Sequence, residues 1–171
     1  MSAAPNAAAP ITAALFDTPL LGALPVEHLC DLSVDLERPL IIPTPRGTLA
    51  PYVGKGGRLD GPRLRGAFLP GSVDWAVHGT DGIGRLDIRG AIRTDDDALI
   101  YFESRGVTKF PPDGRQRLAN GERLPFAETY LRTTPKLETS DERYTWVNEL
   151  ALVGYNELSP GRIDWRIYQL L

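Results

Sequence analysis

The sequence predicts an all-β protein, a single closed antiparallel barrel of about eight to ten strands. Apolar and polar residues alternate with a period of two along most of the chain, which is typical of strands with one buried face. The 17 glycines and 15 prolines make up about a fifth of the residues and suit many short strands joined by turns. So many antiparallel strands in one domain form a barrel or a sandwich, and a barrel is favoured because closure removes unpaired edges.

The first expected strand covers residues 26–37, where a largely apolar row alternates with a largely polar one. The apolar row is Val26, His28, Cys30, Leu32, Val34 and Leu36. Residues 39–61 are rich in Pro and Gly and should form loops around a short strand near 48–53. Further strands are expected at 63–69, 73–78, 83–93, 98–107, 126–134, 144–154 and 162–171, with a polar loop at 111–123.

Length and composition indicate one folded domain, residues 16–171, preceded by a disordered tail at residues 1–15. The first fourteen residues include seven alanines and no charge, and Pro5 and Pro10 would break a helix. The first basic residue is Arg38, so the charged start of a secretory signal is missing. No apolar run is long enough for a membrane span, and the net charge of −3 argues against a nucleic-acid partner.

The chain has one cysteine, Cys30, so no internal disulfide forms, and we expect a cytoplasmic protein. Cys30 and His28 share a strand face and would suit either a metal site or a packed core. Their aliphatic row favours the core, and two histidines and one cysteine give no recognisable ligand spacing. We therefore expect no metal and no cofactor. His78 would be either a surface group at a strand end or an acid–base group in a pocket.

Strand 83–93 is the most informative for function, because Asp87 and Arg89 lie on its polar face. One interpretation is a solvated outer face of alternating charge, which is usual in antiparallel sheets. The other places both residues inside a barrel that holds one small ligand, where a guanidinium would keep the carboxylate ionised. Similar rows of aromatic and polar residues, such as Glu128, Tyr130 and Arg132, suit a ligand site and a barrel core equally well.

Several short motifs occur in a specific order and spacing. They include Leu69-Pro70-Gly71-Ser72-Val73-Asp74-Trp75, Leu86-Asp87-Ile88-Arg89, Tyr130-Leu131-Arg132 and Tyr144-Thr145-Trp146-Val147-Asn148. From about residue 24 to the C-terminus the chain resembles the domain-of-unknown-function 3237 family. It departs from the family pattern at Ser72 and Val73, where glycines are usual, and at Asp97, where the family has Gly.

The resemblance implies a closed antiparallel barrel, similar in outline to lipocalin-type or cyclase-type barrels, that self-associates into a homo-oligomer. It implies no settled activity. The family pattern keeps nine positions that would line a site, which favours the interior interpretation for Asp87 and Arg89. The nine are Asp74, Trp75, Asp87, Arg89, Tyr101, Tyr130, Arg132, Trp146 and Asn148.

The function we expect is cofactor-independent acid–base catalysis of the lyase, hydratase, isomerase or cyclase type. The substrate would be a small apolar or aromatic metabolite in the barrel lumen. Asp87 would be the base or its anchor, Arg89 and Arg132 would bind negative charge, and Tyr101 or Tyr130 would donate a proton. Trp75 and Trp146 would form apolar walls, with Asp74 and Asn148 among the binding residues. The alternative is a lipocalin-like carrier without catalysis.

The tail gives the first testable prediction. Its uncharged, alanine- and proline-rich sequence offers no amphipathic face that could dock. Deleting residues 1–15 should therefore leave the melting temperature of the protein within a few degrees of the full chain. A thermal unfolding experiment checks this, and a large loss would mean that the tail pairs with the barrel or with another subunit.

Overall fold

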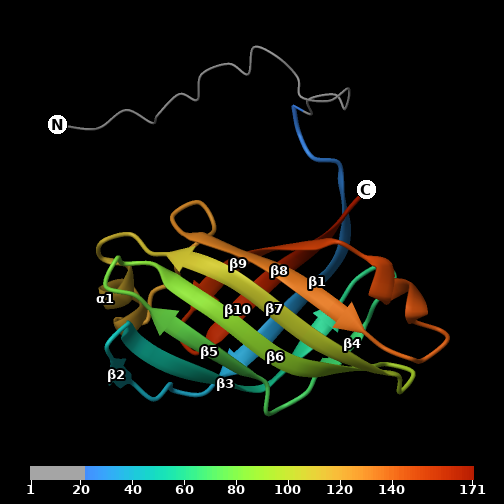
Figure 1. Cartoon of the computed structure of the whole chain (residues 1–171), viewed down its shortest axis with the longest axis horizontal. Coiled ribbons are helices and arrows are strands. Elements are labelled where there is room, and N and C mark those ends of the chain that lie inside the picture. Colours follow the sequence, from blue (N-terminus) through green and yellow to red (C-terminus); the bar gives the residue numbers. More distant parts are fainter. Residues whose placement is uncertain (1–21) are drawn as a thin grey trace.

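The computed structural model describes residues 22–171, so the expected tail at residues 1–15 lies outside the described residues. Within these residues the chain forms ten strands and two short helices (Figure 1). The strands are β1 (Val26–Leu36), β2 (Ile42–Thr44), β3 (Gly47–Asp60), β4 (Gly66–Phe68), β5 (Val73–His78), β6 (Gly84–Thr94), β7 (Leu99–Lys109), β8 (Tyr130–Glu138), β9 (Leu152–Ser159) and β10 (Arg162–Leu170). The helices are α1 (Gly114–Ala119) and the 3₁₀ helix η1 (Thr145–Glu149).

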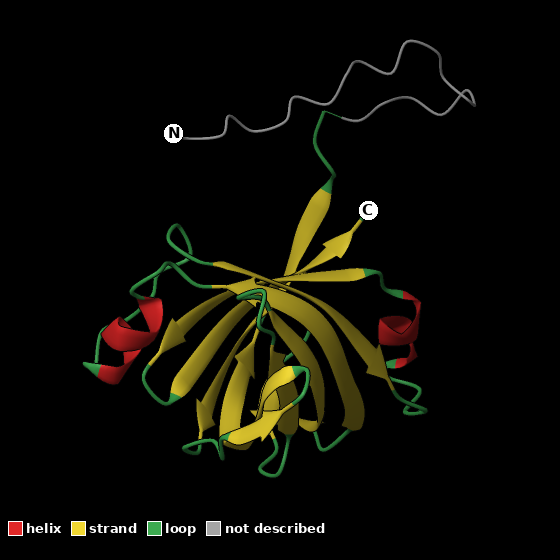
Figure 2. Cartoon of the chain, turned by 60° about the vertical axis from the view of Figure 1, so that its left-hand side comes forward, coloured by secondary structure: helices red, strands yellow, loops and turns green. Residues whose placement is uncertain are grey.

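Eight strands close into an antiparallel barrel in the order β1-β10-β9-β8-β7-β6-β5-β3, and β3 returns to β1 (Figure 2). Strands β4 and β5 share the place between β3 and β6, one toward each end of the barrel. Strand β2 pairs only with the start of β3, and the two form a short extension of the sheet. The predicted all-β closed antiparallel barrel is confirmed. Within residues 22–171 no helix is long and apolar enough to cross a membrane.

Strand β3 closes the barrel by bending at Gly54 and Gly56. Its first half pairs with β5 and its second half with β1. The register between β1 and β3 shifts at this bend, and Gly56 has a φ of 118°, which favours glycine. The bend also changes which residues face inward, from Tyr52 before it to the fully buried Leu59 after it. We expected only a short strand here, because the clustered glycines suggested loops.

The interior of the barrel has a packed half and a hollow half. Phe102 lies between them, edge-on to Phe68 with 5.1 Å between ring centroids and stacked on Trp165 at 5.2 Å. On one side of these three rings the core is filled with aliphatic side chains, including Ile92, Ile100, Leu59, Leu64, Leu137 and Val147. On the other side Phe68 and Trp165 form the floor of an open cavity. We call this cavity the lumen.

The prediction that His28 and Cys30 share a packed core face is wrong for His28. A bulge between the two residues shifts the register of β1 against β10, so the side chains no longer alternate there. Cys30 is fully buried, and burial raises the pKa of its thiol to about 12, with Asp31 adding to the effect. His28 lies on the outer surface, where its Nε2 is 2.9 Å from Asp31 Oδ1.

Two further expected strands differ from the observed strands by several residues at both ends. The strand expected at 126–134 is β8, which continues through Pro135 to Glu138, because β8 has no β9 partner at Pro135 and needs no N–H there. The strand expected at 144–154 begins instead as η1, in which the Val147 N–H bonds to the Tyr144 carbonyl. Tertiary packing of Val147 into the core outweighs the strand propensity of this aromatic and β-branched segment.

Gly90 on β6 gives a prediction about packing. A Cβ at this position would lie 2.5 Å from Phe68 Cζ, and the Phe68 ring is buried and held by Phe102. Gly90→Ala should lower the free energy of unfolding by about 1–3 kcal/mol, the usual cost of overpacking. Chemical denaturation measures this loss. The smaller side chain of Phe68→Leu should make Gly90→Ala less harmful in the double variant, and simple additivity of the two changes would contradict the explanation.

The barrel lumen as a candidate functional site

The lumen is a cavity of about 690 Å³ that opens at the end of the barrel bearing α1 (Figure 1). Three segments surround its mouth: residues 37–41 after β1, α1 with the preceding Phe110, and the β9–β10 turn at 159–161. Its walls are mainly apolar, with Val34, Leu86, Ile88, Leu131 and Ile163 among the lining residues. A cavity of this size and character suits one small apolar molecule.

Three polar side chains, Tyr52, Asp74 and His78, project into the lumen from one wall. Asp74 and His78 lie on the same face of β5, and Tyr52 of β3 is paired directly with Asp74 in the strand register. The Tyr52 hydroxyl lies 3.2 Å from His78 Nε2 and forms a hydrogen bond with it. The β3–β5 pairing therefore gathers a phenol, a carboxyl and an imidazole within a largely apolar cavity.

Asp74 is held by a local gap in the β5–β6 ladder. The strands pair Asp74 with Ile88, and the pairing resumes only at Val77 with Arg85. In the gap the backbone N–H of Asp87 donates to Asp74 Oδ1 at 2.9 Å. The pKa of Asp74 is raised to about 7, mainly by burial among apolar side chains; the Asp87 N–H bond opposes this shift and the negative charge of Asp87 adds to it.

The Tyr52–His78 pair is also withdrawn from water. Burial lowers the pKa of His78, and the positive charge of Arg115 lowers it further, so the imidazole is neutral near pH 7. Burial and the nearby Asp74 raise the pKa of Tyr52, which keeps its hydroxyl protonated. Gly84 on β6 makes room for the imidazole, since a Cβ there would lie 3.1 Å from His78 Nδ1. These features preserve a neutral hydrogen-bonded pair beside an ionisable carboxyl.

This arrangement can perform general acid–base chemistry. A carboxyl group with a pKa near 7 exchanges a proton readily at neutral pH, and the neutral phenol can donate a hydrogen bond to developing negative charge. The described residues contain no group of three or more His, Cys, Asp or Glu side chains that could hold a metal ion.

The expectation that Asp87 and Arg89 face the interior is wrong. They alternate along β6 with Leu86 and Ile88, which line the lumen, so their side chains point outward. The two side chains are 46% and 39% exposed. They form an ion pair along the same strand, and the side chains of Glu103 and Arg105 extend the network on the neighbouring β7. The solvated charged face is the observed arrangement.

Most of the other residues expected at the site also lie outside the lumen. Trp75 on β5 is 51% exposed, and Tyr101 and Tyr130 are exposed on β7 and β8. Arg132 lies on the outer face of β8, with its guanidinium 4.2 Å from the ring centre of Phe126 and close to two tyrosine rings. Among the nine residues, Asp74 is the one that lines the lumen.

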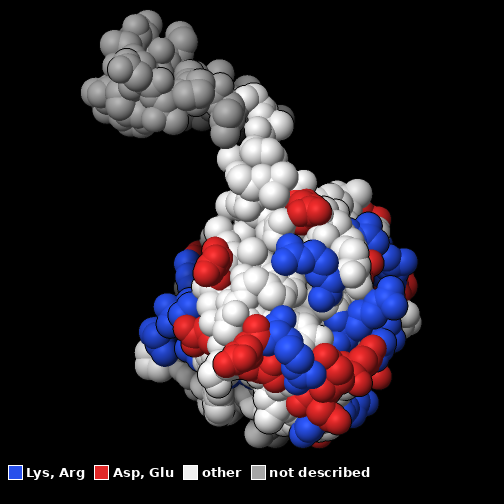
Figure 3. All heavy atoms as spheres, turned by 90° about the vertical axis from the view of Figure 1, so that its right-hand side faces the viewer, with Lys and Arg blue, Asp and Glu red and all other residues white. Residues whose placement is uncertain are grey.

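Trp146 and Asn148 lie in η1, at the end of the barrel opposite the mouth. The Asn148 amide bonds to both the N–H and the carbonyl of Thr139, so it holds the loop after β8. The Arg63 guanidinium lies 3.9 Å from the ring centre of Trp146. These contacts are structural, and they close the packed end of the barrel. Figure 3 shows acidic and basic side chains interspersed over the surface seen from this side.

Sequence analysis missed Tyr52 and left His78 undecided between two roles. The period of two in the strand expected at 48–53 places Tyr52 on one face with Thr48 and Ala50, so a signal was present. Arg115 lies in the segment expected as a polar loop, and nothing in its neighbours marks it as part of a cavity. Only the folding of α1 over the mouth brings Arg115 to the lumen.

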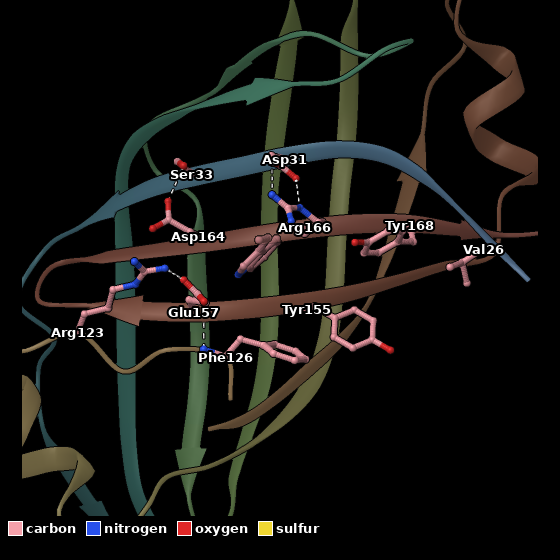
Figure 4. Close-up of a pocket in the computed structure, with 11 residues that line it drawn as sticks. Val26, Asp31, Ser33, Arg123, Phe126, Tyr155, Glu157, Asp164, Arg166 and Tyr168 are labelled. Atoms are coloured by element: carbon pink, nitrogen blue, oxygen red, sulfur yellow. Dashed lines mark hydrogen bonds and ion pairs between the residues drawn. The ribbon is translucent and has the colours of Figure 1, made fainter. Parts of the chain in front are cut away.

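A second hollow, of about 780 Å³, lies on the outer face of β1, β10 and β9 (Figure 4). Its charged groups satisfy one another: the Arg166 Nε and guanidinium N–H groups bind the Asp31 carboxylate at 2.9 and 3.0 Å, and Arg123 pairs with Glu157. Its polar groups are therefore committed to structural contacts. The lumen is the stronger candidate, because its carboxyl group has no cationic partner within ion-pair distance among the described residues.

Comparison with known proteins connects this barrel to a family. The family described as "Protein of unknown function (DUF3237)" matches residues 24–170. The chain belongs to this family. A UPF0311 protein of Clostridium acetobutylicum is 28% identical over 148 residues, which is 84% of this chain and 92% of that protein. The sequence resemblance to the DUF3237 family is thereby confirmed.

Solved structures share the fold. A β-barrel-like protein from Acinetobacter baumannii superposes with a TM-score of 0.76 at 27% identity and covers 91% of this chain and 99% of its own. An enzyme from Penicillium herquei has a TM-score of 0.65 at 20% identity and covers 92% of this chain and 100% of its own. At that identity the similarity to the enzyme concerns the fold alone. No specific activity follows for the DUF3237 chain from these structures.

The raised pKa of Asp74 predicts a pH-dependent stability. Between about pH 4 and 7 the unfolded chain releases this proton while the folded chain retains it, so the carboxyl destabilises the fold increasingly as the pH rises. Asp74→Asn removes this penalty and can still accept the Asp87 N–H bond. The difference in free energy of unfolding between the variant and the parent should therefore be larger at pH 8 than at pH 4, by up to about 4 kcal/mol in favour of the variant.

Urea unfolding at the two pH values measures this gain, and Asp60→Asn is the matched control. Its carboxylate lies at the end of β3 in an exposed ion pair with Arg65, so its removal should change stability by less than about 1 kcal/mol at either pH. If Asp74→Asn is no more stabilising at pH 8 than at pH 4, the carboxyl does not have the raised pKa.

Proposed function

We propose that this protein is a cofactor-independent enzyme that performs acid–base chemistry on a small apolar or aromatic metabolite in the lumen. The observation that carries the proposal is the Asp74 carboxyl, with a pKa of about 7, beside the Tyr52–His78 pair on the same wall of the lumen. The lumen takes the place of the Asp87 and Arg89 site that the sequence suggested. The apolar walls would bind the body of the molecule, and the polar wall would face its reacting atoms.

In the proposed reaction, the Asp74 carboxylate removes a proton from a carbon or hydroxyl group of the substrate. The Tyr52 hydroxyl donates a hydrogen bond to the oxygen on which negative charge develops, and the neutral His78 holds the phenol in place. Return of the proton from Asp74 to a different atom of the same molecule completes an isomerisation or cyclisation without a co-reactant. Elimination or addition of water would use the same groups, which would make the enzyme a lyase or hydratase.

The alternative is a carrier that binds such a molecule without changing it. A carrier gains nothing from a buried carboxyl tuned to neutral pH, and this carboxyl destabilises the fold above pH 7. The perturbed pKa therefore favours an enzyme. The barrel from Penicillium herquei described as an enzyme supports the view that this fold can house catalysis, although its sequence is distant.

The test begins with native mass spectrometry of the purified protein, which identifies a small molecule that co-purifies with it. Turnover of that molecule is then followed as a function of pH for the parent and for Asp74→Asn. The parent kcat/KM should rise with a midpoint near pH 7, as Asp74 loses its proton. Asp74→Asn should reduce kcat by about 10²–10⁴-fold, the usual contribution of a general base, and should leave binding within a few-fold.

Asp60→Asn is again the control, since it removes an exposed carboxylate from the same barrel and should retain turnover. Binding of the molecule without any chemical change in the parent would establish the carrier. Turnover by Asp74→Asn within tenfold of the parent would rule out Asp74 as the base.

A further inference from the structure

A smaller cavity of about 260 Å³ adjoins the lumen. This cavity lies between the β5–β6 turn, which contributes Gly82 and Gly84, and the segment from Phe110 to Arg115 that follows β7. Four residues line both cavities: His78, Thr108, Phe110 and Arg115. These residues mark the junction of the two spaces, and the proposed reaction leaves Thr108 and Arg115 without a role.

Arg115 brings an unneutralised positive charge to this junction. Arg115 is exposed, and its guanidinium makes no ion pair within 4.0 Å and no side-chain hydrogen bond with any of residues 22–171. Arg117, two residues further along α1, binds both Glu122 and Glu128. The Arg115 charge reaches the polar wall, since it lowers the pKa of both His78 and Tyr52. A cation beside an apolar cavity and without a protein partner suits an anionic group of a ligand.

Thr108 presents an unused hydrogen-bonding group at the same place. The residue is 3% exposed, and its Oγ1 atom is buried without a hydrogen-bond partner in the described part of the chain. Thr108 and His78 both lie against Gly84, where a Cβ would overlap Thr108 Cγ2 and approach His78 Nδ1. A buried hydroxyl without a partner is costly, and rotation of the Thr108 side chain toward the junction would let a ligand oxygen satisfy it.

We propose that Arg115 and Thr108 form a subsite for the carboxylate of the substrate, which would be an apolar or aromatic carboxylic acid. This inference rests on the proposed function and names its substrate class. The Arg115 guanidinium and the Thr108 hydroxyl donate to the carboxylate oxygens. In the proposed reaction the Tyr52 hydroxyl donates to the substrate, so the Nε2–H of the neutral His78 donates to the Tyr52 oxygen, and the imidazole has no second N–H for the carboxylate.

The position of the subsite also constrains the length of the substrate. Asp74 and His78 are four residues apart on one strand, which separates their Cα atoms by about 13 Å at ~3.3 Å per residue. The substrate must therefore be long enough to reach from the junction to the Asp74 carboxyl, while its developing negative charge lies near the Tyr52 hydroxyl. This separation also keeps the substrate carboxylate away from the negative charge of Asp74.

The test compares two ligands that differ in charge, 2-naphthoate and 2-naphthamide. Each displaces the neutral fluorescent probe N-phenyl-1-naphthylamine, which reports occupation of the lumen in the full-length protein at pH 8. The parent should bind 2-naphthoate at least tenfold more tightly than 2-naphthamide. Arg115→Gln should abolish this preference while the affinity for 2-naphthamide stays within twofold. Arg105→Gln, which removes the same charge from the outer face of β7, should retain the preference.

Thr108→Val tests the hydroxyl separately, because it keeps the shape of the side chain. It should weaken 2-naphthoate several-fold without lowering the melting temperature, since the hydroxyl has no partner in the free protein. Displacement of 2-naphthoate by millimolar inorganic phosphate in the parent, with no effect on 2-naphthamide, would confirm that the junction binds oxyanions.

Equal affinity of the parent for the two naphthyl ligands would overturn the subsite, and so would an equal loss of both in Arg115→Gln. In either case, binding of the fluorescent probe would leave the proposed function standing. Failure of the fluorescent probe and of both naphthyl ligands to bind the parent would overturn the ligand-binding lumen as well.

Discussion

Closure of the barrel through the β1–β3 pairing is the constraint on which the rest of the structure depends. One strand must pair with β5 along its first half and with β1 along its second half. Strand β3 does so by bending at Gly54 and Gly56. The bend changes the inward-facing set of side chains. Before it, Tyr52 faces the hollow half of the barrel, and after it Leu59 fills the packed half. A straight β3 would place neither residue where it is observed.

The division of the interior balances stability against function. The aromatic rings of Phe68, Phe102 and Trp165, with the aliphatic residues beyond them, provide dense packing at one end. At the other end the barrel keeps an open cavity and a carboxyl, Asp74, whose ionisation burial disfavours. Proteins commonly retain such destabilising groups where chemistry requires them. The charged side chains on the outer surface form solvent-exposed ion pairs, which have little effect on the stability of the fold.

The two proposals assign different tasks to the two ends of the polar wall. Asp74 and Tyr52 lie where a proton would move, and the junction of Arg115 and Thr108 lies where an anionic group would be held. A ligand anchored at the junction would enter the lumen in one orientation, because the opposite orientation would bring two carboxylates together. A carrier of neutral molecules would need neither feature. Together they favour a catalyst that recognises one end of an acid.

The sequence by itself determined the period-two strands, the antiparallel barrel and the DUF3237 family, because alternation and turn residues are local properties. It also separated the two faces of β6, and the apolar face proved to be the inner one. For β5 the alternation did not indicate which face points inward. One face carries the apolar Val73 and Trp75, and the other mixes polar and apolar residues. Only the tertiary structure decided that Asp74 and His78 point inward and that α1 brings Arg115 to the mouth. The physical reason is that these positions follow from register with distant strands and from chain closure, which no local pattern encodes.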